Sequence, residues 1–270
     1  MTIAFGLIIV GDEILSGKRA DKHLPKTIEL LHERGLNLAW VRGVGDDRPR
    51  ITQALRDAFA SGDAVFCCGG IGATPDDHTR QCAAQALGVD LALHPEAKAL
   101  IQERMRDVAV EQGAAYAPEH PDNLHRLNMG VIPVGAQIIP NPYNKIPGFT
   151  CATERGTVHF LPGFPVMAWP MMAWVLDQHY AEHHRVGAWM ERSVVVFGAM
   201  EATLTPLMER IEAEHPVKVF SLPSVDHPVH GRHIELGVKG EPAAVTPAFE
   251  ALMAGLVPFK LHIGPELVRS

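Results

Sequence analysis

The sequence predicts an α/β protein in two parts: a doubly wound, mainly parallel sheet followed by a second, smaller α+β domain. Three observations carry this prediction. Strand-like and helix-like segments alternate through the first half, a glycine-rich loop follows a buried strand-like run at residues 69–80, and the composition changes near residues 181–192. Alternating strands and helices are typical of a parallel sheet covered by helices on both faces. We therefore expect one domain over residues 1–180 and another over 190–270.

Three apolar runs have the pattern of strands buried on both faces. They are residues 2–10, 36–44 and 63–68. Strands of this kind that run parallel bring their carboxyl ends to one edge of the sheet. Ligands of doubly wound sheets bind at that edge, so the segments that follow these runs are the first places to look for a site.

Helical periodicity predicts the segments between and after these strands. In the first helix, over 22–34, the apolar side chains that share a face are Leu24, Ile28 and Leu31. Asp47 has the place of an N-cap for the second helix, which Gly62 ends. A third helix is expected over 75–87 with Thr74 as its cap, and a fourth over 95–112.

The rest of the chain is read from its turn residues. Residues 118–150 are rich in Pro, Asn and Gly, which predicts an ordered loop. A hairpin is expected over 149–163 and a helix over 165–179. The second domain has a β-α-β-β-α pattern, with strands at 193–198, 217–221 and 233–239 and helices at 201–214 and 243–256.

The second domain offers no glycine loop and no paired carboxylates at a strand end. We expect a packing or dimerisation module, and hence a homo-oligomer. The apolar side chains expected to need a partner surface are Val194, Val196, Leu204, Leu207 and Ile211.

The composition excludes several classes of protein. The 270 residues are 47% hydrophobic and 20% charged with a formal net charge of −7, and no Lys/Arg-rich run marks a nucleic-acid surface. No apolar stretch approaches the ~20 residues of a membrane span. The N-terminal run lacks a basic region and a cleavage site, so we expect a cytoplasmic protein. The four cysteines form no CxxC pair, which argues against structural zinc and disulfides.

The stretch "GGIGATPDDHTR" at residues 69–80 is the strongest functional signal. Glycines let backbone amides approach an anion closely, whereas adjacent carboxylates repel an anion unless a cation stands between them. The stretch therefore predicts a phosphate and a cation together. The alternative is a tight turn in which Asp76 and Asp77 only neutralise a helix dipole.

Two further strand ends carry acids to the same edge. "GDEILSG" at 11–17 ends the first strand, and "GVGDD" at 43–47 ends the second. Asp12 and Glu13 are expected near the loop, although a polar turn explains them equally well. Asp47 is better explained as a helix cap, which leaves Asp46 free to act as a ligand.

Taken in order, "VGDEILSG", "VGDD", "GGIGATPDDHT", "NPYNKIPGF" and "LPGFP" resemble the molybdopterin-binding domain of molybdenum-cofactor biosynthesis proteins and CinA-type competence/damage-inducible proteins. The CinA-type branch is the better match. The resemblance covers nearly the whole chain. The C-terminal amidohydrolase domain of longer members has no room here, so we expect its activity to be absent.

The resemblance implies a pocket for a phosphorylated, ring-bearing ligand, either molybdopterin or a nucleotide-sugar such as ADP-ribose. It also implies metal-dependent pyrophosphate hydrolysis with magnesium or cobalt. Asp77 and Asp46 are the expected catalytic residues, and they would hold the metal with Glu13. The expected ligand-binding residues are Gly11, Asp12, Glu13, Gly69, Gly70, Gly72, Thr74, Asp76, Thr79 and Gly163.

The chain departs from the CinA-type pattern at three places. Asp21-Lys22-His23 replaces an Asn-x-Asn pair, Asn144-Lys145-Ile146 replaces Gly-Thr-Ala, and Val166-Met167 replaces a polar pair. These departures predict a reshaped outer pocket.

One cluster lies outside this pattern. It could be a metal site or a solvated loop between two strands, and Pro228 and Gly231 favour the loop because they break any helical register. Its members are Asp226, His227, His230 and His233.

Three functions follow from these patterns. The first is a metal-assisted hydrolase of a phosphoanhydride, with the amides of Gly70–Thr74 holding a phosphate. The second is a pterin-phosphate binding protein without turnover. The third is a scaffold whose second domain docks another macromolecule. All three predict a small phosphorylated partner or a protein partner, and neither nucleic acid nor a membrane.

Overall fold

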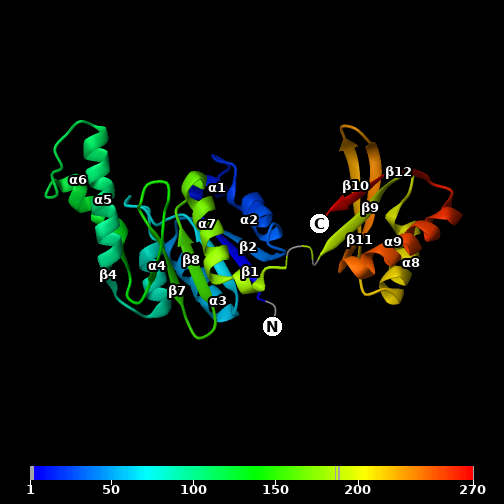
Figure 1. Cartoon of the computed structure of the whole chain (residues 1–270), viewed down its shortest axis with the longest axis horizontal. Coiled ribbons are helices and arrows are strands. Elements are labelled where there is room, and N and C mark those ends of the chain that lie inside the picture. Colours follow the sequence, from blue (N-terminus) through cyan, green and yellow to red (C-terminus); the bar gives the residue numbers. More distant parts are fainter. Residues whose placement is uncertain (1–2, 186, 188, 270) are drawn as a thin grey trace. The chain divides into compact units, whose positions relative to one another are not determined.

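The computed structural model describes residues 3–185, 187 and 189–269. It divides the chain into two compact units, Met1–His184 and Arg185–Ser270, each with its own sheet and hydrophobic core (Figure 1).

The first unit is built on a six-stranded sheet with strand order β2-β1-β3-β8-β7-β6. The first four of these strands are mutually parallel, whereas β7 and β6 are antiparallel to their neighbours. The strands are β1 (Phe5–Val10), β2 (Leu38–Val44), β3 (Ala64–Cys68), β6 (Gln137–Ile139), β7 (Gly148–Ala152) and β8 (Thr157–Leu161). This confirms the predicted mainly parallel α/β sheet, and the predicted hairpin is formed by β7 and β8.

Helices cover both faces of this sheet. One core contains side chains of α2 (His23–His32) and α7 (Pro165–His179), and the other contains side chains of α3 (Arg48–Ser61) and α4 (Thr79–Leu87). Strand β1 shows why, because Phe5, Leu7 and Ile9 belong to the first core while its alternate residues Ile8 and Val10 belong to the second.

The helix boundaries follow the chemistry of the caps. Asp47 caps α3 by accepting a hydrogen bond from the amide of Arg50 (3.0 Å), and Gly62 ends the helix in the left-handed conformation at φ 86°. In α2, Asp21 accepts from the amides of His23 and Leu24, but Ile28 is 38% exposed, so its expected place in the core is wrong.

The helix predicted from Pro75 begins at Thr79 instead. Thr74 caps no helix, because its amide and hydroxyl both donate to Asp77 Oδ2, and the amide of Asp77 donates back to Thr74 O. This closed turn competes with helical geometry over residues 75–78. Asp77 therefore lies in a loop before α4 and not in its first turn.

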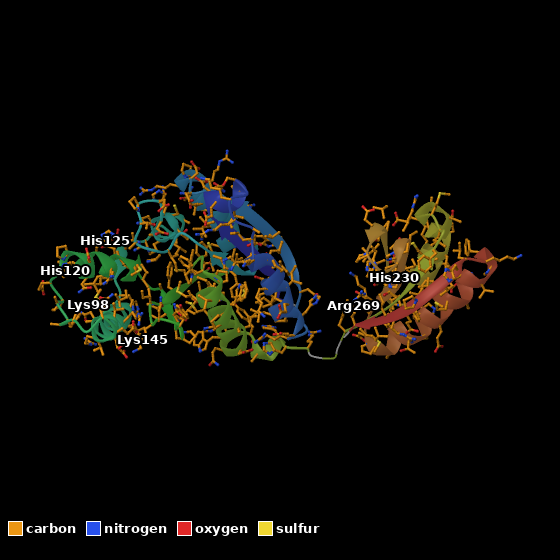
Figure 2. The ribbon with its side chains drawn as sticks, turned by 90° about the horizontal axis from the view of Figure 1, so that it is seen from above. Lys98, His120, His125, Lys145, His230 and Arg269 are labelled. Atoms are coloured by element: carbon orange, nitrogen blue, oxygen red, sulfur yellow. The ribbon has the colours of Figure 1, made fainter. Side chains whose placement is uncertain are left out.

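A further segment projects from the loop side of the first unit. It contains β4 (Leu91–Leu93), α5 (Pro95–Glu111), α6 (Pro121–Arg126), η1 (Leu127–Gly130) and β5 (Val131–Pro133). Figure 2 shows Lys98, His120, His125 and Lys145 around α5 and α6. The prediction of a loop over 118–150 was wrong in part, because α6, η1, β5 and β6 lie within it.

The second unit is an antiparallel sheet of order β10-β11-β9-β12 with two helices. Its elements are β9 (Met190–Phe197), α8 (Glu201–Glu214), β10 (Lys218–His227), β11 (Gly231–Gly240), α9 (Pro242–Leu256) and β12 (His262–Arg269), with the short turn η3 (Val257–Phe259) before β12. The short turn η2 (Ala181–His183) belongs to the first unit. Strand β12 was not predicted, since Gly264 and Pro265 interrupt it and its register shifts there.

The apolar side chains that were expected to need a partner surface face inward. Val194, Val196, Leu204, Leu207 and Ile211 are all buried in the unit's own core, so that expectation was wrong. Side chains of β11 and α9 complete this core, which residue spacing alone did not show.

One segment of the described residues, Pro242–Phe259, is long and apolar enough to cross a membrane by length and composition, contrary to the expectation that no stretch would qualify. Helices that pack in a core pass the same test. Its buried residues, which lie in the core of the second unit, are Val245, Ala248, Phe249, Leu252 and Leu256.

Candidate functional site

The glycine loop, Gly69–His78, joins β3 to α4 in a conformation that requires glycine at its start. Gly69 has φ 107° and Gly70 has φ 68°, and a Cβ on Gly69 would lie 2.2 Å from the carbonyl oxygen of Val10. Thr79 fastens this turn, because its hydroxyl donates to Gly69 O and its amide donates to Gly70 O, each at 3.0 Å.

Most amides of this loop are left for another acceptor. Those of Gly70, Gly72 and Ala73 donate to no other described residue, while that of Thr74 is taken by Asp77. The predicted phosphate contact with the loop amides is thus available up to Ala73 and not at Thr74. Successive free amides of this kind form an anion-binding concavity.

Two side chains fix the loop, Arg80 from α4 and His125 from α6 of the projecting segment. The Arg80 guanidinium donates to Gly72 O at 2.6 Å, and His125 Nε2 lies 2.8 Å from Ala73 O. Both carbonyls are therefore held toward α6 and η1. Since the carbonyl and the following N–H of a trans peptide point in opposite directions, this arrangement turns the amide of Ala73 away from Arg80.

A cavity of about 610 Å³, the first cavity, opens beside the loop. It is lined by ten of the predicted residues, namely Gly11, Glu13, Asp46, Gly69, Gly70, Gly72, Thr74, Asp76, Asp77 and Gly163. Two predicted ligand contacts do not line it. Thr79 is fully buried in the turn described above, and Asp12 faces Asp46 instead.

The ends of β1 and β2 are joined by a reciprocal pair of hydrogen bonds. The amide of Asp12 donates to Asp46 Oδ2 at 2.9 Å, and the amide of Asp46 donates to Asp12 Oδ1 at 3.2 Å. Partial burial raises the pKa of Asp46 above its usual value, and the nearby carboxylates of Asp12, Glu13 and Asp76 add to that shift. A cation beside Asp46 would relieve this repulsion.

The carboxylates do not form a complete metal site by themselves. Among the residues described by the structure, no three His, Cys, Asp or Glu side chains converge closely enough to hold an ion. The oxygen donors of Glu13, Asp46 and Asp77 suit a hard cation such as Mg²⁺, which commonly takes one or two carboxylates and completes its shell with water and substrate phosphates. The residues present fit a metal of that type bound together with a phosphorylated ligand.

The outer wall of the first cavity is apolar. Its side chains are Met129, Ile146, Pro147, Phe164 and Met167. Ile146 and Met167 belong to the segments whose departure from the CinA-type pattern predicts a reshaped outer pocket, whereas the other three were not assigned to the site. Arg19 is the basic residue of the lining and was also missed.

His23, another point of departure, supports the far rim. It is 5% exposed, its Nε2 lies 3.0 Å from the carbonyl oxygen of Gly163, and its Nδ1 has no partner. Because a carbonyl only accepts, Nε2 carries the proton. His23 thus holds the turn before α7 in place.

The histidine cluster of the second unit lies at the end of the β10–β11 hairpin. The ring centroids of His227, His230 and His233 are 4.9 to 5.6 Å apart, yet the described residues include no group able to hold a metal. His227 Nδ1 accepts from the amides of Val229 and His230 and so caps the turn. The interpretation as a solvated loop holds only for this turn, since Asp226 and His233 lie within the strands.

Comparison with known proteins agrees with this architecture. Residues 6–182 match the model of the probable molybdopterin binding domain. A CinA-like protein of Anaeromyxobacter dehalogenans strain 2CP-1 is 35% identical over 160 residues, which are 59% of this chain and 37% of that protein. A CinA-like protein of Citrifermentans bemidjiense is 30% identical over 203 residues, which are 75% of this chain and 46% of that protein.

A solved CinA structure is also similar to this chain. The crystal structure of CinA from Thermoplasma acidophilum, a protein described as of unknown function, has a TM-score of 0.54 and 29% identity, covering 64% of this chain and 96% of that one. The chain spans less than half the length of the two CinA-like proteins that it matches. Because the family model covers well over half of its residues, the chain belongs to the probable molybdopterin binding domain family.

Proposed function

We propose that the first cavity binds a phosphorylated nucleotide- or pterin-class ligand and hydrolyses its pyrophosphate bond with the help of a divalent cation. One observation carries the proposal. Free amides of a glycine loop and four carboxylates, Glu13, Asp46, Asp76 and Asp77, line a single cavity. A phosphate attracted by the amides is repelled by the carboxylates, which are also negatively charged. A cation bound between them offsets this repulsion.

The ligand class follows from the two walls. The loop amides and Arg19 offer donors to phosphate oxygens, and the apolar wall around Met129 and Phe164 offers a surface for a planar ring. A volume of about 610 Å³ suits a ligand of nucleotide size. We take ADP-ribose as the test substrate because it combines a ring with a pyrophosphate.

In the proposed reaction a water oxygen attacks one phosphorus, and the bond from that phosphorus to the bridging oxygen breaks. Two phosphate monoesters leave. A bound cation would offset negative charge on the phosphates and lower the pKa of the attacking water. Glu13, Asp46 and Asp77 would hold it, and the amides of Gly70, Gly72 and Ala73 would keep the pyrophosphate in place.

The test incubates the protein with ADP-ribose and Mg²⁺, Co²⁺ or excess chelator. Chromatography then measures the release of AMP and ribose 5-phosphate. We expect turnover with metal and none with chelator. Asp46→Asn should lower kcat/KM by roughly 100-fold, because one metal-ligating charge is lost. Asp77→Asn should behave similarly.

Asp47→Asn is the matched control. Asp47 is the next residue, but it only caps α3, and asparagine caps equally well, so kcat/KM should stay within about twofold of the wild type. Turnover that resists chelator would contradict the metal role.

The binding protein without turnover is favoured by one observation, the absence of three converging ligands among the described residues. Tight binding of ADP-ribose or a pterin phosphate with no product under any metal would support it over the hydrolase.

A further inference from the structure

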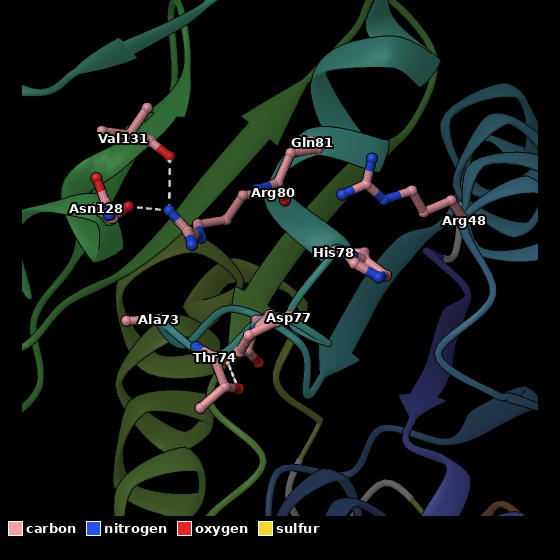
Figure 3. Close-up of a pocket in the computed structure, with 10 residues that line it drawn as sticks. Arg48, Ala73, Thr74, Asp77, His78, Arg80, Gln81, Asn128 and Val131 are labelled. Atoms are coloured by element: carbon pink, nitrogen blue, oxygen red, sulfur yellow. Dashed lines mark hydrogen bonds between the residues drawn. The ribbon is translucent and has the colours of Figure 1, made fainter. Parts of the chain in front are cut away.

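A second cavity, of about 290 Å³, adjoins the first through Ala73, Thr74 and Asp77 of the glycine loop. Its other walls come from the starts of α3 and α4 and from η1 and β5. Figure 3 shows its polar side chains, which are Arg48, Thr74, Asp77, His78, Arg80 and Gln81.

Arg80 places a buried positive charge in this wall. The side chain is 4% exposed, and its partners are the backbone carbonyls of Gly72, Asn128 and Val131, two of them marked in Figure 3. Its Nε has no partner. Carbonyl dipoles satisfy its donors without neutralising the charge. Burial lowers the pKa of the guanidinium, and the nearby Asp77 carboxylate opposes that shift.

The neighbouring groups add to the positive potential. Arg48 is exposed at the first position of α3, and His78 stands at the start of α4, where no side chain caps the helix. The N-terminus of α4 carries its own partial positive charge. The acid of this cavity, Asp77, accepts hydrogen bonds from the amide and hydroxyl of Thr74 and offsets one of the two arginine charges, so Arg48 and Arg80 together leave an excess of positive charge.

Gln81 indicates that the ligand of this cavity carries a hydrogen-bond donor. Its Oε1 is buried in the wall and has no partner, so it lacks a donor. A phosphate that carries one proton offers such a donor together with acceptor oxygens for the arginines. A sulfate, fully ionised near neutral pH, offers acceptors alone.

We propose that the second cavity is a phosphate site, formed by Arg48, His78, Arg80 and Gln81 and separate from the ligand pocket. It takes inorganic phosphate or the phosphate end of a small monoester, since less than half the volume of the first cavity is available. The site does not depend on the proposed hydrolysis, and it stands or falls by its own binding measurement.

Isothermal titration of the full chain with inorganic phosphate tests the site. We expect saturable binding, weakened roughly tenfold in Arg48→Gln because one charge-assisted hydrogen bond is lost. Arg50→Gln is the matched control: Arg50 lies in the same turn of α3 and does not line the cavity. Arg50→Gln should stay within about twofold of the wild type. Arg19→Gln identifies phosphate bound in the first cavity, because only binding there should weaken in that variant.

Three results would overturn the proposal. They are no saturable phosphate binding, equal affinity in Arg48→Gln and Arg50→Gln, or a loss in Arg19→Gln alone, which would place the anion in the first cavity. Sulfate should bind several-fold more weakly than phosphate, and equal binding would remove Gln81 from the site. Titration with ribose 5-phosphate distinguishes the two candidate ligands. If the natural ligand is a monoester, ribose 5-phosphate should bind more tightly than inorganic phosphate.

Discussion

The two units are built from similar materials and differ in the direction of their strands. Both pack apolar strands against helices; the first unit buries a core on each face of its sheet, and the second unit buries one core. In the first unit β1, β2 and β3 are parallel, so the segments that follow them, with Gly11–Glu13, Asp46 and the glycine loop, meet at one edge. In the second unit every described pairing is antiparallel, and strands that are neighbours in the sheet end at opposite edges. Strand direction alone therefore gathers polar groups in one unit and disperses them in the other.

Glycine has a different use in each unit. Gly69 adopts a positive φ where the backbone of β1 approaches the loop, whereas Gly237 lies inside β11 beneath the ring of Phe220. A Cβ on Gly237 would lie 2.4 Å from Phe220 Cζ, the far end of a side chain that can move, and 2.7 Å from the carbonyl oxygen of Arg192 in β9, which can move less. The first glycine shapes a site and the second makes room for packing.

Substituting these two glycines tests their different roles, and it should give the largest effect of the changes considered. Gly69→Ala places a Cβ 2.2 Å from a backbone oxygen at φ 107°, and neither atom can move without reshaping the loop. We expect affinity for ADP-ribose to fall by at least ~100-fold, measured by calorimetry. Gly237→Ala should lower the melting temperature of the second unit and leave that affinity unchanged. Equal losses of affinity in the two variants would show that the loop conformation does not carry the binding.

The fold was predictable where one local signal decided the outcome. Asp47 and Gly62 bound α3 as expected, and the burial of β1 on both faces follows from its continuous apolar run. The start of α4 was not predicted correctly, because two local signals compete there: Pro75 is a good helix start, and the hydrogen bonds between Thr74 and Asp77 close a turn instead. Strand β12 was not predicted, because Gly264 and Pro265 interrupt its strand pattern.

The site was predictable at the strand ends and not beyond them. Gly-rich and acidic residues after apolar runs marked the loop edge correctly, since topology brings such residues together. Arg80 was not identified, because two of its partners, the carbonyls of Asn128 and Val131, lie far away in the sequence. Phe164 and Met129 of the apolar wall were not identified either, since an apolar residue that lines a cavity resembles any other apolar residue in a sequence.

Acid should lower the unfolding free energy of the first unit through a buried histidine. His159, in the core of the first unit, is 1% exposed, with Nδ1 2.8 Å from Thr150 Oγ1 and Nε2 2.7 Å from Tyr180 OH. Burial lowers the pKa of His159 to about 3. The unfolded chain takes up this proton near its ordinary pKa of ~6.5, so stability is complete above that pH and decreases as the pH falls.

From pH 7.5 to pH 5, the first unit should lose about 2 kcal/mol of unfolding free energy from this group alone. Urea denaturation followed by tryptophan fluorescence measures it, because Trp40, Trp169 and Trp174 all lie in the first unit. His159→Gln removes the titrating group and should reduce the pH dependence, whatever it does to stability at pH 7.5. An unchanged pH dependence in that variant would assign the acid sensitivity to other residues.

The smallest effect is expected from removing the second unit, and it is the sharpest test of the comparison. Both cavities are lined by residues of Met1–His184, and the cores of that unit contain no residue from beyond it. A chain that ends at His184 should therefore bind ADP-ribose with an affinity within about threefold of the full chain, which is less than 1 kcal/mol. Calorimetry measures this, and circular dichroism checks that the shortened chain keeps its native helix content. A loss of more than tenfold in a natively folded chain would show that residues 185–270 contribute to the site, and the histidines of the β10–β11 hairpin would then be the first to substitute. Retained affinity would instead limit the second unit to assembly or stability, as expected for a sheet whose strand ends do not converge.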